Sequence, residues 1–387
     1  MVPQELIDAI LSEIDDDDET LKACALASRR FLPPAQRLLF KEMSFPMQQK
    51  FRGQPEGASN PITLLVQRAS NLLSSSPHLL AFVRELNVGS MYWKEGWEAL
   101  RVLLCTFHPA KLACFSMDGA LDEMPRDVCV AITGIFAQSS LQKVMFWSWD
   151  DIPPSILTAA FASCRNVVAR CNTLEMATAT DAASSTSNQG TNTPAIDFDD
   201  GATPLECLTM EIRAGAGDFL LRPTISRLIG GVRELEIFDD ALTAAHLCST
   251  TLTHLTVCMP WGLDMDSAEF PRLGALRVLT LKITTTGAWA ISMELVAPSL
   301  PTSVPRLEVL NVDALMDGRR MAQAPALDAA LTALAFLREV NLTISASAAR
   351  GAELANYRKS VEEELPAVHA AGLLTFSQTK LGSTEGR

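Results

Sequence analysis

The sequence is 387 residues long, 48% of its residues are apolar, and its formal net charge at pH 7 is −13. This length suits a small module followed by a large domain or a repeat array, and the apolar content is sufficient for a substantial core. The acidic residues are spread along the chain, which argues against a nucleic-acid partner, because phosphate contacts require lysine and arginine.

Cysteine usage and hydropathy indicate a soluble, intracellular protein. None of the nine cysteines forms a CxxC pair, so we expect small buried thiols in a reducing compartment rather than disulfides. Glu5 and Asp8 interrupt any signal-peptide pattern, and the longest uncharged apolar stretch, 128–141, is too short to span a bilayer. The sequence therefore predicts a cytoplasmic or nuclear location, or both, and no membrane partner.

The chain begins with a predicted amphipathic helix. Pro3 and Glu5 suit its first turn, where a missing N–H has no cost and negative charge is favoured. Its apolar stripe consists of Leu6, Ile7, Ile10, Leu11 and Ile14.

Two further short helices are predicted before residue 41. The acidic run 15–18 supplies N-cap oxygens for the second helix, whose last turn is expected to contain Arg29 and Arg30. Pro33 and Pro34 then end that helix and start a third at 35–40. A unit this small cannot bury both faces of each helix, so we expect a partner to cover the excess apolar surface.

These residues resemble the F-box, a three-helix module that binds Skp-family adaptor proteins. The F-box pattern begins with Leu-Pro and Glu-Leu, continues with an Ile one turn later, and ends with Arg-x-Trp. The matching residues are Val2, Pro3, Glu5, Leu6, Ile10, Leu21, Leu26, Arg29 and Phe31. Val2 and Phe31 replace the commoner Leu and Trp, and both keep a bulky apolar side chain. The stretch from Glu19 to Phe40 is especially similar to F-box proteins of mushroom-forming, basidiomycete-type fungi.

The resemblance implies that the module binds an adaptor and, through it, cullin and RING subunits. The adaptor-binding residues that it implies are Val2, Pro3, Leu6, Ile7, Ile10, Leu21, Leu26 and Phe31. The alternative is that these forty residues are an ordinary amphipathic helical hairpin of the main domain.

Beyond a linker expected at 41–60 and a helix expected at 61–75, a six-residue phrase recurs. Its form is apolar-x-x-apolar-x-apolar, and its copies begin at Val83, Leu112, Leu141, Leu205, Val232, Leu252, Leu276, Leu307 and Leu337. Most copies are separated by roughly 20 to 31 residues, close to the leucine-rich-repeat period. Helix-like segments lie between them, which implies parallel strands with helices packed behind.

This body resembles a divergent leucine-rich-repeat solenoid. It departs from the common pattern because the Asn usually found shortly after each strand is missing. The expected fold class is α/β: a three-helix F-box-like module at 1–40, then an irregular leucine-rich-repeat-like solenoid with parallel strands at 61–376. An unrelated α/β sheet is the alternative.

Several segments are expected to depart from the regular repeat. A degenerate repeat is expected around 167–176, and 177–203 is expected to be a disordered insertion, because it is rich in Ala, Ser, Thr and Asn and then acidic. A Glu-rich helix at 352–365 is expected to cap the open end of the solenoid, and 377–387 is expected to be a flexible tail.

No pattern of residues predicts catalysis. The five histidines lie far apart, without HExxH or zinc-ligand spacing, and neither a P-loop nor a nucleophile elbow is present. We expect no enzyme activity, no cofactor and no metal.

A target-binding surface is expected where alternate strand residues face away from the core. The candidates are Met145, Trp147, Glu236, Phe238, His254, Thr256, Thr280 and Asn311. Trp147 and Phe238 are included because aromatic residues often anchor interfaces. The alternative for both is that neighbouring loops cover them.

The two parts together predict a substrate-receptor subunit of an SCF-type cullin–RING ubiquitin ligase, which holds an unknown target protein and performs no chemistry. A second hypothesis is a leucine-rich-repeat scaffold with no role in ubiquitin transfer. A third, a hydrolase built on an α/β sheet, lacks any supporting motif.

Deleting residues 177–203 tests the insertion hypothesis. The shortened protein should fold as well as the full chain, because the entropy of closing a surface loop depends only weakly on its length. Soluble yield and circular dichroism measure this directly. If the deletion abolishes soluble expression, the segment is part of the fold.

Overall fold

The computed structural model describes residues 3–45, 61–89, 94–109, 111–119, 124–138, 141–174, 204–214, 216–238, 242–259, 270–283, 297–315, 325–346 and 351–380. Within these ranges the chain is an α/β protein that divides into two compact units, residues 1–205 and 206–387. None of the helices in these ranges has both the length and the apolar character needed to cross a membrane.

Three short helices begin the first unit, as the sequence predicts. They are α1 (Gln4–Ser12), α2 (Asp18–Ala27) and α3 (Leu32–Leu39). Two expected boundaries are wrong. Ser28 is extended and ends α2, so Arg29 and Arg30 lie outside its last turn. The third helix starts at Leu32 rather than at residue 35, because Pro33 and Pro34 fit its first turn and do not break it.

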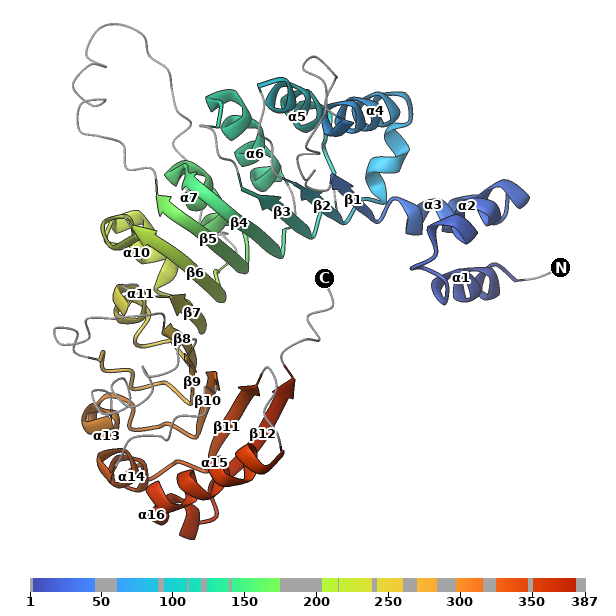
Figure 1. The fold of residues 1–387 in the computed structure, drawn as a ribbon. Helices are drawn as coiled ribbons and strands as arrows, with labels where there is room; N and C mark the ends of the chain where they lie inside the picture. The colour runs from blue at the N-terminus through green and yellow to red at the C-terminus, as the bar shows by residue number, and fades with distance from the viewer. Residues whose placement is uncertain are drawn as a thin grey trace, which may run out of the picture. The chain divides into compact units, whose positions relative to one another are not determined.

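Parallel strands make up the rest of the first unit, each paired with the next in chain order. The strands are β1 (Glu42–Phe45), β2 (Glu85–Val88), β3 (Cys114–Asp118), β4 (Lys143–Ile152) and β5 (Asn166–Leu174). The helices between them are α4 (Pro61–Ser75), the 3-10 helix η1 (Pro77–Ala81), α5 (Lys94–Thr106), α6 (Arg126–Gln138) and α7 (Pro154–Ser163). Helices α4 to α7 all lie on one face of these strands (Figure 1).

The second unit repeats this plan. Its strands are β6 (Cys207–Ala214), β7 (Glu234–Phe238), β8 (His254–Met259), β9 (Val278–Ile283), β10 (Val309–Leu315), β11 (Glu339–Ala346) and β12 (Leu374–Lys380). Each pairs in parallel with the next. Its helices are α9 (Ala216–Leu220), α10 (Pro223–Ile229), α11 (Leu242–Leu247), η3 (Ala297–Ser299), α13 (Leu300–Ser303), α14 (Pro325–Thr332), α15 (Gly351–Glu364) and α16 (Pro366–Ala370).

The six-residue phrases lie side by side in register, which builds one core in each unit. Fourth-position residues are Cα partners on neighbouring strands, as in the row Leu235, Leu255, Leu279, Leu310 and Val340. All five are buried between the strands and the helices. Because helices cover only one face, the residues between these positions remain on the other face.

The linker expected at 41–60 begins instead with a strand, because Phe40 to Phe45 is a further copy of the phrase. Met43 and Phe45 pair with Leu86 and Val88 of β2. Residues 46–60 lie outside the described residues.

Two other segments also form regular strands. The degenerate repeat expected at 167–176 forms β5, where Val167 and Ala169 align with the buried positions of β4. The tail expected at 377–387 is a continuation of β12 as far as Lys380. Helix α15 therefore connects β11 to β12 and does not end the array. The insertion expected at 177–203 and the last residues, 381–387, lie outside the described residues.

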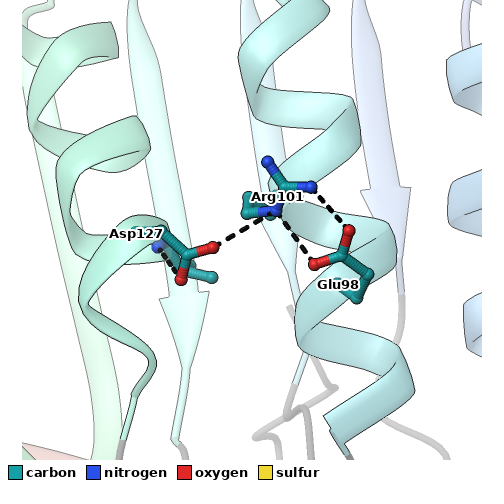
Figure 2. A network of polar contacts seen from close by, with 4 residues as sticks. Glu98, Arg101 and Asp127 are labelled. Atoms are coloured by element: carbon teal, nitrogen blue, oxygen red, sulfur yellow. Dashed lines mark hydrogen bonds and ion pairs between the residues drawn. The ribbon is translucent and has the colours of Figure 1, made fainter.

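An ion network joins α5 to α6 in the helical layer of the first unit (Figure 2). Arg101 lies between Glu98 of its own helix, with a 2.9 Å Nε–Oε2 hydrogen bond, and Asp127 of α6, with a 3.2 Å Nε–Oδ2 contact. The hydrogen bond from Arg101 lowers the pKa of Glu98. Both carboxylates are exposed and Arg101 is partly exposed, so the network adds little to stability.

Replacing Leu279 by Asp tests the register of the second unit. Leu279 is fully buried in β9, and an unpaired buried charge costs several kcal/mol, a large share of the total stability of a domain. We expect the variant to lose its cooperative thermal transition in circular dichroism. The control is Thr280→Asp, one residue further on the uncovered face, which should keep a cooperative transition and melt much closer to the wild type. Equal melting of the two variants would contradict the register.

Candidate interaction sites

The three N-terminal helices have a complete core of their own. Ile7, Leu11, Leu21 and Ala35 are buried together at its centre. Further apolar side chains pack around them, namely Ile14, Cys24, Ala25, Phe31, Leu38 and Leu39. All three helices contribute to this small core, which fixes their relative positions.

Two of the eight predicted adaptor-binding residues belong to that core. Ile7 is 3% exposed and Leu21 is 0% exposed, because both point between the helices. In this structure both side chains therefore pack within the module itself, and their assignment as adaptor contacts stays a prediction. Phe31 is half-buried against the same core. Val2 lies outside the described residues.

The other predicted residues are on the surface. Leu6 (51% exposed) and Ile10 (52%) lie one turn apart on the same face of α1, and Leu26 of α2 is 89% exposed. Pro3 is exposed at the start of α1. Leu32, which sequence reasoning did not single out, is also exposed at the start of α3. The sequence feature that could have identified Leu32 is its position directly before Pro33 and Pro34.

The turn between α1 and α2 is fixed by Asp17. Its carboxylate accepts hydrogen bonds from the Thr20 hydroxyl (2.6 Å) and the Thr20 backbone N–H (3.1 Å), which together lower the pKa of Asp17. This is an N-cap, as the acidic run 15–18 predicts. The cap sets where α2 begins and therefore where Leu26 is presented.

The predicted target-binding residues lie on the face of the strands that helices leave uncovered. Met145 and Trp147 of β4 are half-buried in the first unit. In the second unit, Glu236, Phe238, Thr256, Thr280 and Asn311 are half-buried and His254 is exposed. None of them belongs to the core of its unit.

Four of these residues form one row across neighbouring strands. Glu236, Thr256, Thr280 and Asn311 are successive Cα partners, and Asn341 of β11 extends the row. The Asn341 amide donates to the Asn311 side-chain oxygen (3.0 Å), and the Asn311 amide donates to the Thr280 hydroxyl (3.1 Å). Asn341 was missed because its phrase was identified by its apolar positions alone. His254 and Phe238 lie in the rows before and after this one.

An ion pair crosses the same face. Lys282 Nζ lies 2.6 Å from Glu236 Oε1, although the two residues are on strands β9 and β7. Partial burial disfavours the charge on Lys282, but the hydrogen bond and the negative charge of Glu236 outweigh it, so the pKa of Lys282 is raised. Lys282 therefore stays protonated at neutral pH, and the ion pair places two opposite charges on this face.

A β-bulge in β4 separates the two tryptophans of the Trp147-Ser-Trp149 segment. The pairing with β5 shifts between Phe146 and Trp149, so both of those rings point into the core. Trp149 donates from Nε1 to the Met117 carbonyl oxygen (3.3 Å). Ser148 takes a positive φ of 54°, which is unusual for a residue with a side chain.

The bulge leaves Trp147 on the uncovered face. Its ring lies under the guanidinium group of Arg170, with 4.7 Å from Cζ to the ring centroid. Arg170 therefore packs against this aromatic side chain. Tryptophan, arginine and methionine are among the residues enriched at protein interfaces, and Met145 lies two residues before Trp147.

All nine cysteines lie within the described residues. None of the nine forms a disulfide, and burial raises the pKa of Cys164 and of Cys248 to about 12, so these two thiols stay protonated at neutral pH. Within the described ranges, no group of three or more His, Cys, Asp or Glu side chains is arranged to hold a metal ion.

Comparison with models of known protein families and with curated protein sequences finds no match for this chain.

The bulge gives a test of how Trp147 is presented. A Cβ atom at Gly119 would clash with the Ser148 carbonyl oxygen, so Gly119→Ala must displace the bulge. We expect a loss of roughly 1–3 kcal/mol, as for overpacked sites. Ser148→Gly relieves the positive φ and should be neutral or slightly stabilising. Denaturant titration measures both, and an unaffected Gly119→Ala variant would contradict the bulge.

Proposed function

We propose that the chain is a substrate-receptor subunit of an SCF-type cullin–RING ubiquitin ligase. In this proposal α1, α2 and α3 form an F-box that binds a Skp-family adaptor and, through it, the cullin and RING subunits. The surface of the strands binds a target protein, and the side chains on that surface determine which protein binds. The chain positions the target and performs no bond-making step itself.

The proposal rests on how the apolar residues of the first three helices are divided between a buried core and the exposed surface. Their core is complete with Ile7, Leu11, Leu21 and Ala35, yet Leu6, Ile10 and Leu26 remain exposed. Fully burying one such side chain contributes roughly 1.5–3 kcal/mol. Exposed apolar groups in excess of what the fold uses are typical of an interaction surface.

The finer fold in this proposal is a divergent leucine-rich-repeat solenoid. Three features support it: strands that pair in parallel in chain order, a six-residue phrase in register across them, and helices on one face. A fold of this kind leaves a broad strand face free for a protein partner.

A scaffold without a role in ubiquitin transfer is the second candidate, because the strand face alone explains binding of a target. Purification of the tagged chain from its cells distinguishes the two. Recovery of the adaptor together with a cullin supports the ligase role, whereas recovery of the adaptor alone, or of neither, supports the scaffold.

Replacing Leu6 by Asp tests the adaptor surface. The change places an unpaired carboxylate in a desolvated interface, so adaptor recovery in a pull-down should fall by at least about thirtyfold, the equivalent of ~2 kcal/mol. The fold should survive, because Leu6 lies outside the core of the helices.

Ser12→Asp is the matched control, because Ser12 is exposed on the other side of α1 and the substitution adds the same charge as Leu6→Asp. Leu26→Asp provides a second variant, because Leu26 is almost fully exposed. Circular dichroism on all four proteins checks the fold. Equal adaptor recovery from wild type and Leu6→Asp would contradict the F-box assignment.

A further inference from the structure

Residues at the second position of the phrase form a row at the N-terminal ends of the strands in the second unit. Each is linked to the next by the backbone: Thr253 N–H donates to the Arg233 carbonyl, Arg277 N–H to Thr253, Glu308 N–H to Arg277, and Arg338 N–H to Glu308. The row therefore has the spacing of the strands themselves. Its order is Glu206, Arg233, Thr253, Arg277, Glu308 and Arg338, since Arg233 N–H donates in the same way to the Glu206 carbonyl.

The arginines of this row are on the surface. The side chains of Arg277 and Arg338 are 61% and 76% exposed, and Arg233 is exposed as well. Glu308 lies between the first two: its carboxylate is 2.9 Å from Arg277 Nη1 and 3.8 Å from Arg338 Nη1. One carboxylate thus holds two guanidinium groups in place but can balance only one charge. Arg306, two residues before Glu308, is also exposed.

The three arginines lie on every second strand. Adjacent strands are about 4.8 Å apart, so successive arginines of the row are separated by about 9.6 Å at the backbone. A fully extended peptide does not match this distance, because its side chains recur on one face every two residues, at about 6.6 Å. A polyproline II helix does match, since it places every third residue on one face at about 9.3 Å.

We propose that the row Arg233, Arg277 and Arg338 binds an acidic segment of a target protein in polyproline II conformation, with a carboxylate at every third residue. Each carboxylate would take a paired hydrogen bond from the planar guanidinium fork opposite it. The three arginines of the row outnumber its two carboxylates, Glu206 and Glu308, so the row is locally positive although the whole chain carries a net charge of −13. The inference rests on the proposed function in that a target protein supplies the segment.

A synthetic peptide tests this without adaptor or cellular target. The probe is fluorescein-labelled (Glu-Pro-Pro)₃-Glu, titrated with the full-length protein and followed by anisotropy. The spacing control has the same composition with its four glutamates adjacent, and the charge control replaces glutamate by lysine. We expect the probe to bind at least about fivefold more tightly than the spacing control, with an affinity that falls as salt rises.

Two variants with opposite expected effects identify the surface. The double variant Arg277→Gln/Arg338→Gln should weaken probe binding about tenfold, whereas Arg126→Gln, an exposed arginine at the start of α6, should leave it unchanged. Glu308→Gln removes the internal counter-charge and should tighten binding several-fold.

Three results would overturn the proposal: no binding of the probe at millimolar protein, equal binding of the spacing control, or no response to either the arginine variant or Glu308→Gln. Because Glu308→Gln predicts a gain, the test remains decisive even if the arginine variant fails to fold. Failure here would leave the adaptor assignment standing, since no adaptor is present.

Discussion

The structure depends on one repeated backbone contact. In each regular repeat the carbonyl oxygen at the second position of the phrase accepts hydrogen bonds from two consecutive N–H groups of the next strand. Arg84 accepts from Ala113 and Cys114 in the first unit, and Arg277 accepts from Glu308 and Val309 in the second. This contact fixes the register, and the register decides which side chains meet the helices and which remain free. A slip of one residue would exchange the two faces.

The register explains how far the sequence could predict the strands. Nine phrases were recognisable because each begins with Leu or Val and carries two more apolar residues at fixed positions. Three further strands follow phrases that begin with Phe40, Cys164 and Ala371. Phe40 is the C-cap of α3 and Ala371 the C-cap of α16, so both phrases overlap helix ends. The first residue of each of these phrases fits both a helical and a strand periodicity, although the residues at the fourth and sixth positions are apolar as in the other phrases.

Other features of the candidate sites depend on contacts between distant segments and have no local signal. A helical stripe predicts that Leu6, Ile7 and Ile10 are apolar neighbours, but only the packing of α3 and α2 against α1 decides that Ile7 is buried. The same holds for Trp147 and Trp149, which strict alternation would place on one face. A glycine at 119, one strand away, leaves room for the Ser148 carbonyl and allows the bulge that buries the second ring.

The junction at Lys41 links the two proposed activities more closely than a flexible linker would. Helix α3 ends at Leu39 and β1 begins at Glu42, and the Lys41 carbonyl accepts hydrogen bonds from Arg84 and Glu85 N–H groups at 2.8 and 3.1 Å. The Asn87 amide donates to the Glu42 carboxylate (2.7 Å) on the next strand. Only Phe40 and Lys41 therefore separate the three helices from the first strand. Under the proposed function, an adaptor bound to Leu6 and Ile10 therefore constrains the direction of β1. A receptor that performs no chemistry acts by such positioning, because a lysine held within reach of the ligase reacts faster than one that diffuses freely.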